Sequence, residues 1–433
     1  MLPNKVCSPH DDLTDWLQSF SGSPSNRFQH SYSKWKDTGS APWLLAALAN
    51  ASKDSAQAEE LLAAANNVPH VSPAFWSARF YRERVLVQKG RLDIVRQELD
   101  QDLRHTEGLV NPLNQSSKNL LLALRARASA NLEDFLQFAI RTPSGLVYMD
   151  EYNTKLTDDD KDPRDDYMRQ QYATPHFDDD AGAVLNNFLP LSQLAEVLKS
   201  STLPDGARRD VAFMAFTRAI VTENTSLAEK VAQASIPVAP DIADDLNTFL
   251  RAPTKQQKDF AAVWIILHHP EMQPALETGT SRATAAGKID SFQNNWWAHF
   301  KFEAVAGGDD PDYLYYLQWW NRLPSHLKPI FPEGKILPPA FVSETDLSAA
   351  RSDWNKLERL PLAGDWLASR TLQFAHSNPN DARIPEALHL AVRATRFGGS
   401  DAHTPNYSKQ AYQLLHKKYP NNEWTKKTPY WFK

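Results

Sequence analysis

Apolar residues recur along this chain with the three- and four-residue spacing that is typical of amphipathic helices. Towards the C-terminal end, this spacing predicts two helices, at 384–396 and 407–419, joined by a loop with two glycines and a proline. Their apolar positions are Ile384, Ala387, Leu388, Ala391 and Val392 in the first helix, and Ala411, Leu414 and Leu415 in the second. Two short antiparallel helices cannot bury their apolar faces alone, so such a pair needs a neighbouring pair.

The same spacing predicts helices through most of the chain. They cover 12–20, 41–51, 55–67, 74–90, 91–103, a stretch opened by Pro112, 132–140, 181–189, 191–199, 204–221, 227–234, 242–250 and 255–268. We expect Ser40 and Asp54 to cap two of these helices and Gly90 to end a third. Leu13 and Leu17 are expected on the apolar face of the first helix. Strict apolar–polar alternation over five residues is hard to find, so the predicted fold is all-α, an α-solenoid of antiparallel helical hairpins.

Two stretches interrupt this pattern and suggest the domain organisation. Residues 141–180 contain many aspartates and three prolines, and residues 324–339 are rich in proline. A long irregular stretch inside a compact domain is unusual, so the acidic one is predicted to be a linker or a functional loop. The predicted parts are an N-terminal helical-hairpin segment at 1–140, an acidic linker at 141–180, a central helical segment at 181–345 and a C-terminal segment at 346–433.

The C-terminal fifty residues carry a resemblance to a known family. Lys418, Tyr419 and Pro420 close one predicted helix, Trp424 begins the next, and Tyr430 and Trp431 follow. This ending resembles tetratricopeptide (TPR) units of bacterial cell-envelope proteins. Leu390 and Arg393 stand where the family usually has its glycine and tyrosine, so no TPR register is assigned to the rest of the chain. The resemblance implies a protein–protein scaffold and slightly favours a periplasmic setting over the cytoplasm.

Composition excludes some classes of function. The 433 residues include 47 basic and 52 acidic side chains, a formal net charge of −5, so no overall field favours nucleic acid. A single cysteine, Cys7, rules out an internal disulfide and a cysteine-based zinc site. No run of 18 apolar residues predicts a membrane span, and residues 1–20 show no signal-peptide pattern.

Motifs for catalysis or metal binding are not found in the sequence. The acidic stretch 158–166 lacks the glycine and closing glutamate of an EF-hand, so a solvated loop is the simpler interpretation. His176 and Asp178 precede a predicted helix, where capping is the expected role, and His268 ends another helix. Nucleophile-elbow and phosphate-loop motifs are missing as well. We therefore predict no catalytic residue, no metal ligand and no cofactor.

An aromatic cluster is the one candidate binding site that the sequence offers. Its members are Trp296, Trp297, Tyr313, Tyr316, Trp319 and Trp320. Adjacent tryptophans on a helix point about 100° apart and are hard to bury together, and Trp and Tyr are common in binding hot spots. The alternative is that they fill a bulky junction in the core. The predicted function is a helical-repeat scaffold or subunit that binds another protein in a larger bacterial assembly. The alternative is a helical-toroid (α/α) enzyme acting on glycans, with the tryptophans as a sugar platform.

Overall fold

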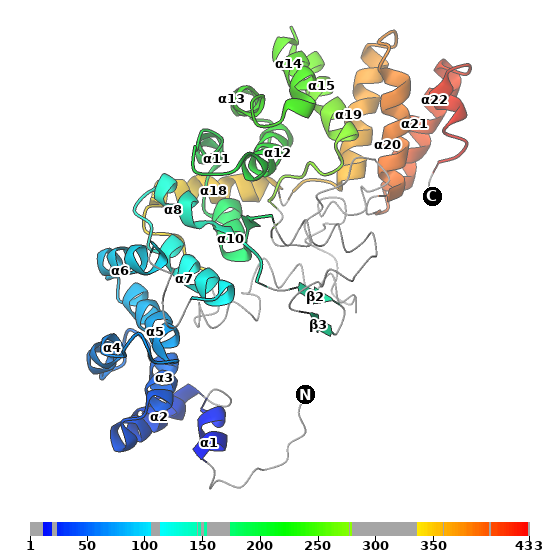
Figure 1. Ribbon diagram of the computed structural model, residues 1–433. Coiled ribbons are helices and arrows are strands. Elements are labelled where there is room, and N and C mark those ends of the chain that lie inside the picture. The colour runs from blue at the N-terminus through cyan, green and yellow to red at the C-terminus, as the bar shows by residue number, and fades with distance from the viewer. Residues whose placement is uncertain are drawn as a thin grey trace, which may run out of the picture. The chain divides into compact units, whose positions relative to one another are not determined.

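The computed structural model describes the residues 12–19, 24–104, 113–144, 146–148, 151–153, 174–276, 278, 336–357, 359–397 and 400–431. Helices account for nearly all regular structure in these residues, which confirms the predicted all-α class (Figure 1). The chain forms two compact units. Among the described residues, unit 1 runs to Pro175 and includes the later segment 336–341, and unit 2 begins at His176 and resumes at Val342. The four parts that the sequence suggested stay a prediction.

Unit 1 is built from short helices that pack against their neighbours in sequence. They are α1 (Asp12–Gln18), α2 (Pro24–Thr38), α3 (Ala41–Asn50), α4 (Ala58–Asn66), α5 (Phe75–Gln88), α6 (Leu92–Arg104), α7 (Gln115–Arg127) and α8 (Leu132–Phe138). Leu48, Leu61 and Leu99 are fully buried in their shared core. Ile336 packs against this core from the later segment, and the Phe341 ring lies 6.0 Å from that of Phe135.

Helix ends in unit 1 follow the predicted chemistry only in part. Gly90 has a φ of 72° and follows α5, as its assignment to the helix end requires. Ser40 occupies the N-cap position of α3, although its side chain makes no capping bond. The assignment of Asp54 as a cap was wrong, because α4 begins only at Ala58. The expected apolar face of α1 is not buried either, since Leu13 and Leu17 are 61% and 55% exposed.

Short strands occur where the sequence predicted an irregular linker. They are β1 (Ile140–Arg141), β2 (Leu146–Tyr148), β3 (Glu151–Asn153) and β4 (His176–Phe177). β2 and β3 form an antiparallel pair in which Val147 lies opposite Tyr152. The stretch 141–180 is therefore not irregular throughout, while its residues 154–173 lie outside the described part of the chain.

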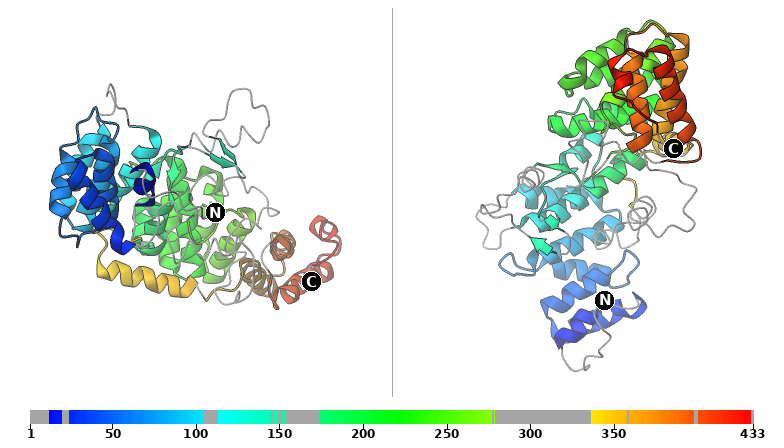
Figure 2. Two further views of the ribbon diagram at one scale, coloured as in Figure 1. Left: turned by 90° about the horizontal axis from the view of Figure 1, so that it is seen from below. Right: turned by 90° about the vertical axis from the view of Figure 1, so that its right-hand side faces the viewer.

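Unit 2 continues the helical arrangement. Its elements are α10 (Asp179–Asn187), α11 (Leu191–Val197), α12 (Asp205–Val221), α13 (Thr225–Ser235), the 3₁₀ turn η1 (Pro240–Ile242), α14 (Ala243–Arg251), α15 (Lys255–His268), α18 (Glu344–Leu357), α19 (Ala363–Ser377), α20 (Ile384–Phe397), α21 (Thr404–Lys418) and α22 (Glu423–Lys426). Asp178 caps α10, as predicted, by accepting the Asp179 N–H. α18, yellow in Figure 2, lies apart from the orange and red helices that follow it and packs on α10.

The core of unit 2 joins helices that are far apart in sequence. α15 packs against both α19 and α20, and the rings of Phe260 and Phe374 stack with centroids 3.8 Å apart. The predicted apolar face of α20 is buried, with Ile384 and Leu388 inaccessible to solvent. α19 approaches α20 so closely that a Cβ at Gly364 would lie 2.9 Å from the carbonyl oxygen of Ala394. The Phe260–Phe374 stack and the close approach at Gly364 hold α19 against α15 and α20.

A candidate binding groove between α15 and α19

A groove opens between α15, α19 and the turn that joins α12 to α13. We call it the α15–α19 groove, and it is lined along its length by Lys255, Asp259, Val263 and Arg370. One end adds Ala219, Ile220, Glu223, Thr225, Phe249 and Trp366, and the other adds Gln256, Phe260, Gln373 and Phe374. The space that water can occupy is about 360 Å³ at the second end and about 20 Å³ at the first, beside Glu223 and Trp366. All these residues belong to unit 2.

The base of the groove is apolar because it is the edge of the unit 2 core. Val263 and Phe374 are buried and belong to that core, and Ile220 packs against it. Trp366 is 6% exposed, so only a small part of its indole is available at the groove. The helical spacing that buries one face of α15 and α19 thus leaves the neighbouring residues of both helices along the rim.

Charged side chains form the rim and are already paired. Lys255 Nζ lies 2.6 Å from Asp259 Oδ2, one turn later on α15. Arg370 Nη2 lies 2.7 Å from Glu223 Oε1, which connects α19 to the α12–α13 turn. Arg370 also lies over the Trp366 ring, with its guanidinium carbon 5.5 Å from the ring centroid. Pairs this exposed contribute only about 0–1 kcal/mol each, so a ligand can exchange with them.

Two helices begin at the groove. Thr225 is the first residue of α13 and Lys255 the first of α15, and both line it. The Asn224 and Thr254 side chains cap the third N–H of each helix. The positive ends of both helix dipoles therefore add to the cations of the rim.

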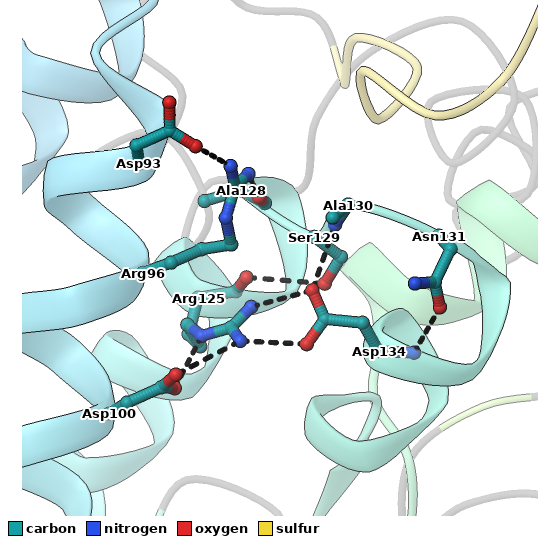
Figure 3. Close-up of polar contacts among 9 residues, drawn as sticks. All are labelled: Asp93, Arg96, Asp100, Arg125, Ala128, Ser129, Ala130, Asn131 and Asp134. Carbon is teal, nitrogen blue, oxygen red and sulfur yellow. Dashed lines mark hydrogen bonds and ion pairs between the residues drawn. The ribbon is translucent and has the colours of Figure 1, made fainter.

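Other buried polar groups serve the fold. In Figure 3 the guanidinium of Arg125, on α7, lies between Asp100 of α6 and Asp134 of α8. Its Nε is 2.6 Å from Asp100 Oδ1, and its Nη2 is 2.7 Å from Asp134 Oδ1. Burial raises the pKa of Asp134, but the hydrogen bonds from Arg125 and from the Ala130 N–H, together with the positive charge of Arg125, outweigh it, and the pKa lies below its usual value. The two carboxylates bind different nitrogens of the guanidinium, so Arg125 links α6, α7 and α8.

A second charged cluster connects α5 and α6. Arg79 lies 2.6 Å from Glu98 and 2.7 Å from Asp102, and Glu83 is inaccessible to solvent. Burial, reinforced by a hydrogen bond with Glu98, raises the pKa of Glu83 to about 9. Glu83 is therefore neutral at pH 7, which removes the cost of a third negative charge in the cluster.

Arg218 of α12 forms a third buried polar site. Its Nε donates to the Pro274 carbonyl at 2.8 Å and its Nη1 to that of Asn186 at 3.3 Å. The Trp354 indole N–H donates to the same Asn186 oxygen at 2.7 Å, which holds α18 on α10. Burial lowers the pKa of Arg218 to about 10, so the side chain stays charged at neutral pH.

The binding site predicted from the sequence lies outside the described residues. Trp296, Trp297, Tyr313, Tyr316, Trp319 and Trp320 all fall in 279–335. Sequence reasoning did not find the α15–α19 groove, because Glu223 and Arg370 are 147 residues apart and neither belongs to a motif. The apolar periodicity of 204–221, 242–250 and 255–268 predicted helices in this region, but it indicated their buried faces and not a groove.

Metal ligands, membrane spans and similar proteins give no indication of the function. Within the described ranges, no three His, Cys, Asp or Glu side chains are grouped so that they could hold a metal ion. In the same ranges, no helix combines the length and the apolar character that crossing a membrane requires. No protein-family model matches the chain, and neither a curated protein nor a solved structure matches it. Function must therefore be inferred from the α15–α19 groove and its side chains.

Proposed function

We propose that the protein is a non-enzymatic helical-repeat scaffold or subunit that binds a segment of another protein in the α15–α19 groove. One observation carries the proposal, the combination of an apolar base with a rim of exchangeable charges. Apolar side chains of a bound segment would supply the affinity at the base, and polar contacts at the rim would set its position.

The arrangement of helices supports this proposal. Consecutive helices of unit 2 pack in pairs, α12 with α13, α14 with α15 and α19 with α20. Paired helices that bury their faces against the next pair are the basis of α-solenoids, whose grooves commonly bind other proteins. The TPR-like ending at 418–431 supports the same class and a setting in the bacterial cell envelope. No described residue favours the alternative, a toroid enzyme acting on glycans.

Filling the groove tests the proposed function. Gln373→Trp places a large ring on the exposed rim of α19, and His376→Trp places the same ring on an exposed position of α19 that does not line the groove. Peptides selected from a display library on the unmodified protein should bind Gln373→Trp at least tenfold more weakly, because the new ring fills space that the peptide occupies. A tenfold loss of affinity corresponds to about 1.4 kcal/mol. They should bind His376→Trp normally. Selected peptides that bind both variants equally would locate binding elsewhere.

A further inference from the structure

Arg370 is held in place yet uses only part of its hydrogen-bonding capacity. The aliphatic part of its side chain extends from α19, which packs against α15, and its guanidinium lies over the Trp366 ring. The contact with Glu223 uses Nη2 alone, and no other hydrogen bond to Arg370 is found within the described part of the chain. A guanidinium presents five N–H donors in a planar fork that matches a carboxylate. Donors of Arg370 therefore remain available in the groove.

Its present partner, Glu223, is poorly fixed by comparison. The Glu223 side chain is 62% exposed, whereas that of Arg370 is 33% exposed. Glu223 follows the end of α12 at a φ of 59°, a left-handed conformation that is uncommon for a residue with a Cβ. Removing Glu223 from Arg370 would return its carboxylate to water and leave no buried charge. The cation is thus the fixed member of the pair and the anion the displaceable one.

The surroundings of Arg370 favour a ligand that is both anionic and apolar. Lys255 and the N-terminal ends of α13 and α15 place positive charge along the same groove. Asp259 is the only other carboxylate in the lining, and Lys255 neutralises it. Val263 and Phe374 line the wider end of the groove beside Arg370. An incoming carboxylate therefore meets a net positive rim once Glu223 has moved away.

We propose that the α15–α19 groove selects a peptide segment in which a carboxylate side chain adjoins a large apolar side chain, the carboxylate displacing Glu223 from Arg370. This inference rests on the proposed function and adds the chemistry of the partner. Glu223 is an internal competitor that occupies Arg370 when the groove is empty. The apolar side chain of the segment occupies the wider end of the groove, which Val263, Phe374 and Arg370 line. Selectivity arises because a neutral segment gives Arg370 no replacement for Glu223.

Three fluorescein-labelled peptides test this chemistry by fluorescence anisotropy. They are GSGLELGSG, the same peptide with glutamine in place of glutamate, and the same peptide with lysine there. The glutamate peptide should bind at least about tenfold more tightly than the other two, since charge-assisted bidentate contacts are the stronger hydrogen bonds. Arg370→Gln should abolish this preference. Glu223→Gln should tighten binding of the glutamate peptide by about three- to tenfold, because the competing carboxylate is gone.

Matched variants separate the site from general electrostatics. Glu229→Gln also removes a carboxylate from unit 2, but Glu229 pairs with Lys258 and does not line the groove, so the affinity should not change. Arg208→Gln removes a guanidinium that pairs with Asp205 at the start of α12, outside the groove lining, again without effect. Thermal melts that match the unmodified protein show that each variant is folded. Tighter binding in Glu223→Gln but not in Glu229→Gln supports displacement at Arg370.

The outcomes distinguish this inference from the proposed function. Equal binding of the glutamate and glutamine peptides, or preference for the lysine peptide, would overturn the proposed chemistry while leaving the groove as a binding site. The proposed chemistry is likewise overturned if display-selected peptides bind in the groove and none of the three test peptides does. If Gln373→Trp affects no peptide at all, the groove itself is not the binding site and both proposals fail.

Discussion

At the scale of single residues, a buried aspartate beside a second acid makes part of unit 2 sensitive to pH. Asp365 is 1% exposed in the first turn of α19, where it shares hydrogen bonds with Thr404 and Asp401. Burial is the main reason that its pKa rises to about 6, and the neighbouring Asp401 raises it further. Thr404 and His403 act in the opposite direction but do not compensate. The Asp365 carboxyl therefore takes up a proton well above its usual range.

This pair gives a testable dependence of stability on pH. The folded chain holds the Asp365 proton more tightly than the unfolded chain does, so this residue lowers the free energy of unfolding as pH rises from about 4 to about 6. The total effect is at most about 3 kcal/mol. Asp365→Asn should remove it, and the variant should gain stability over the unmodified protein across that range. Urea denaturation at several pH values measures the difference.

A matched variant and a clear contrary result complete this prediction. Asp244→Asn changes an exposed aspartate in the first turn of α14 and should leave the pH profile unchanged. Other carboxyl groups titrate in the same range, so the informative quantity is the difference between variant and unmodified protein. A constant difference from pH 4 to pH 7 would show that the pKa of Asp365 is not raised in the folded protein.

What the sequence could predict at this scale depended on how local the cause was. Gly90 was predictable because a helix end with positive φ favours glycine. Glu223 adopts a positive φ without being glycine, and nothing in its neighbourhood signals that. The protonation of Glu83 was equally hidden, because it depends on Glu98 and on burial between two helices.

At the scale of elements, helices were predictable because the spacing of apolar residues within each helix indicates which of its faces is buried. The predicted span 255–268 matches α15, and 204–221 differs from α12 by one residue at its start. The strands β2 and β3 were missed because three residues carry too little periodicity for a prediction. Predicted starts failed where a residue was assigned to a helix start from its residue type alone, as Asp54 and Pro112 were. The helix assigned to Pro112 begins instead at Gln115, with Asn114 as its cap.

The Arg125 network provides a test of how helices are joined. Arg125→Ala leaves Asp100 and Asp134 without their shared cation and should lower the free energy of unfolding by about 3 kcal/mol or more. Lys118→Ala on the same helix removes a cation that makes no ion pair among the described residues and should cost under about 1 kcal/mol. Chemical denaturation compares the two. Equal losses would mean that Arg125 adds nothing beyond its helix propensity and packing.

At the scale of the whole molecule, each unit has a core of its own. Two clusters of buried residues among the described ones, one in unit 1 and one in unit 2, share no member. Sequence periodicity could show that such cores exist, but not which distant segments complete them. The packing of 336–341 in unit 1 and of α18 on α10 depends on contacts between residues more than a hundred positions apart. Those pairings are set by shape and by buried hydrogen bonds, which a single sequence does not display.

Separate cores should unfold as separate transitions. Leu86→Ala opens a cavity in unit 1 and Leu388→Ala opens one in unit 2, at a cost of about 2–5 kcal/mol each. Each variant should lower the melting temperature of one calorimetric transition and leave the other in place. Hydrogen exchange assigns each transition to its helices. A single transition lowered equally by both variants would show that the two cores unfold as one cooperative body.

The return of 336–341 to unit 1 has a consequence for the order of events during synthesis. A nascent chain that has reached Pro175 already contains α1 to α8, yet it lacks Ile336 and Phe341, which pack in that unit. All residues of α10 to α15 must leave the ribosome before those two side chains are made. Unit 1 therefore keeps part of its apolar surface uncovered while the first part of unit 2, α10 to α15, is being made, although domains commonly fold in the order of their synthesis. Both units are therefore completed late in synthesis, unit 1 at Phe341 and unit 2 only with its last helices, α18 to α22.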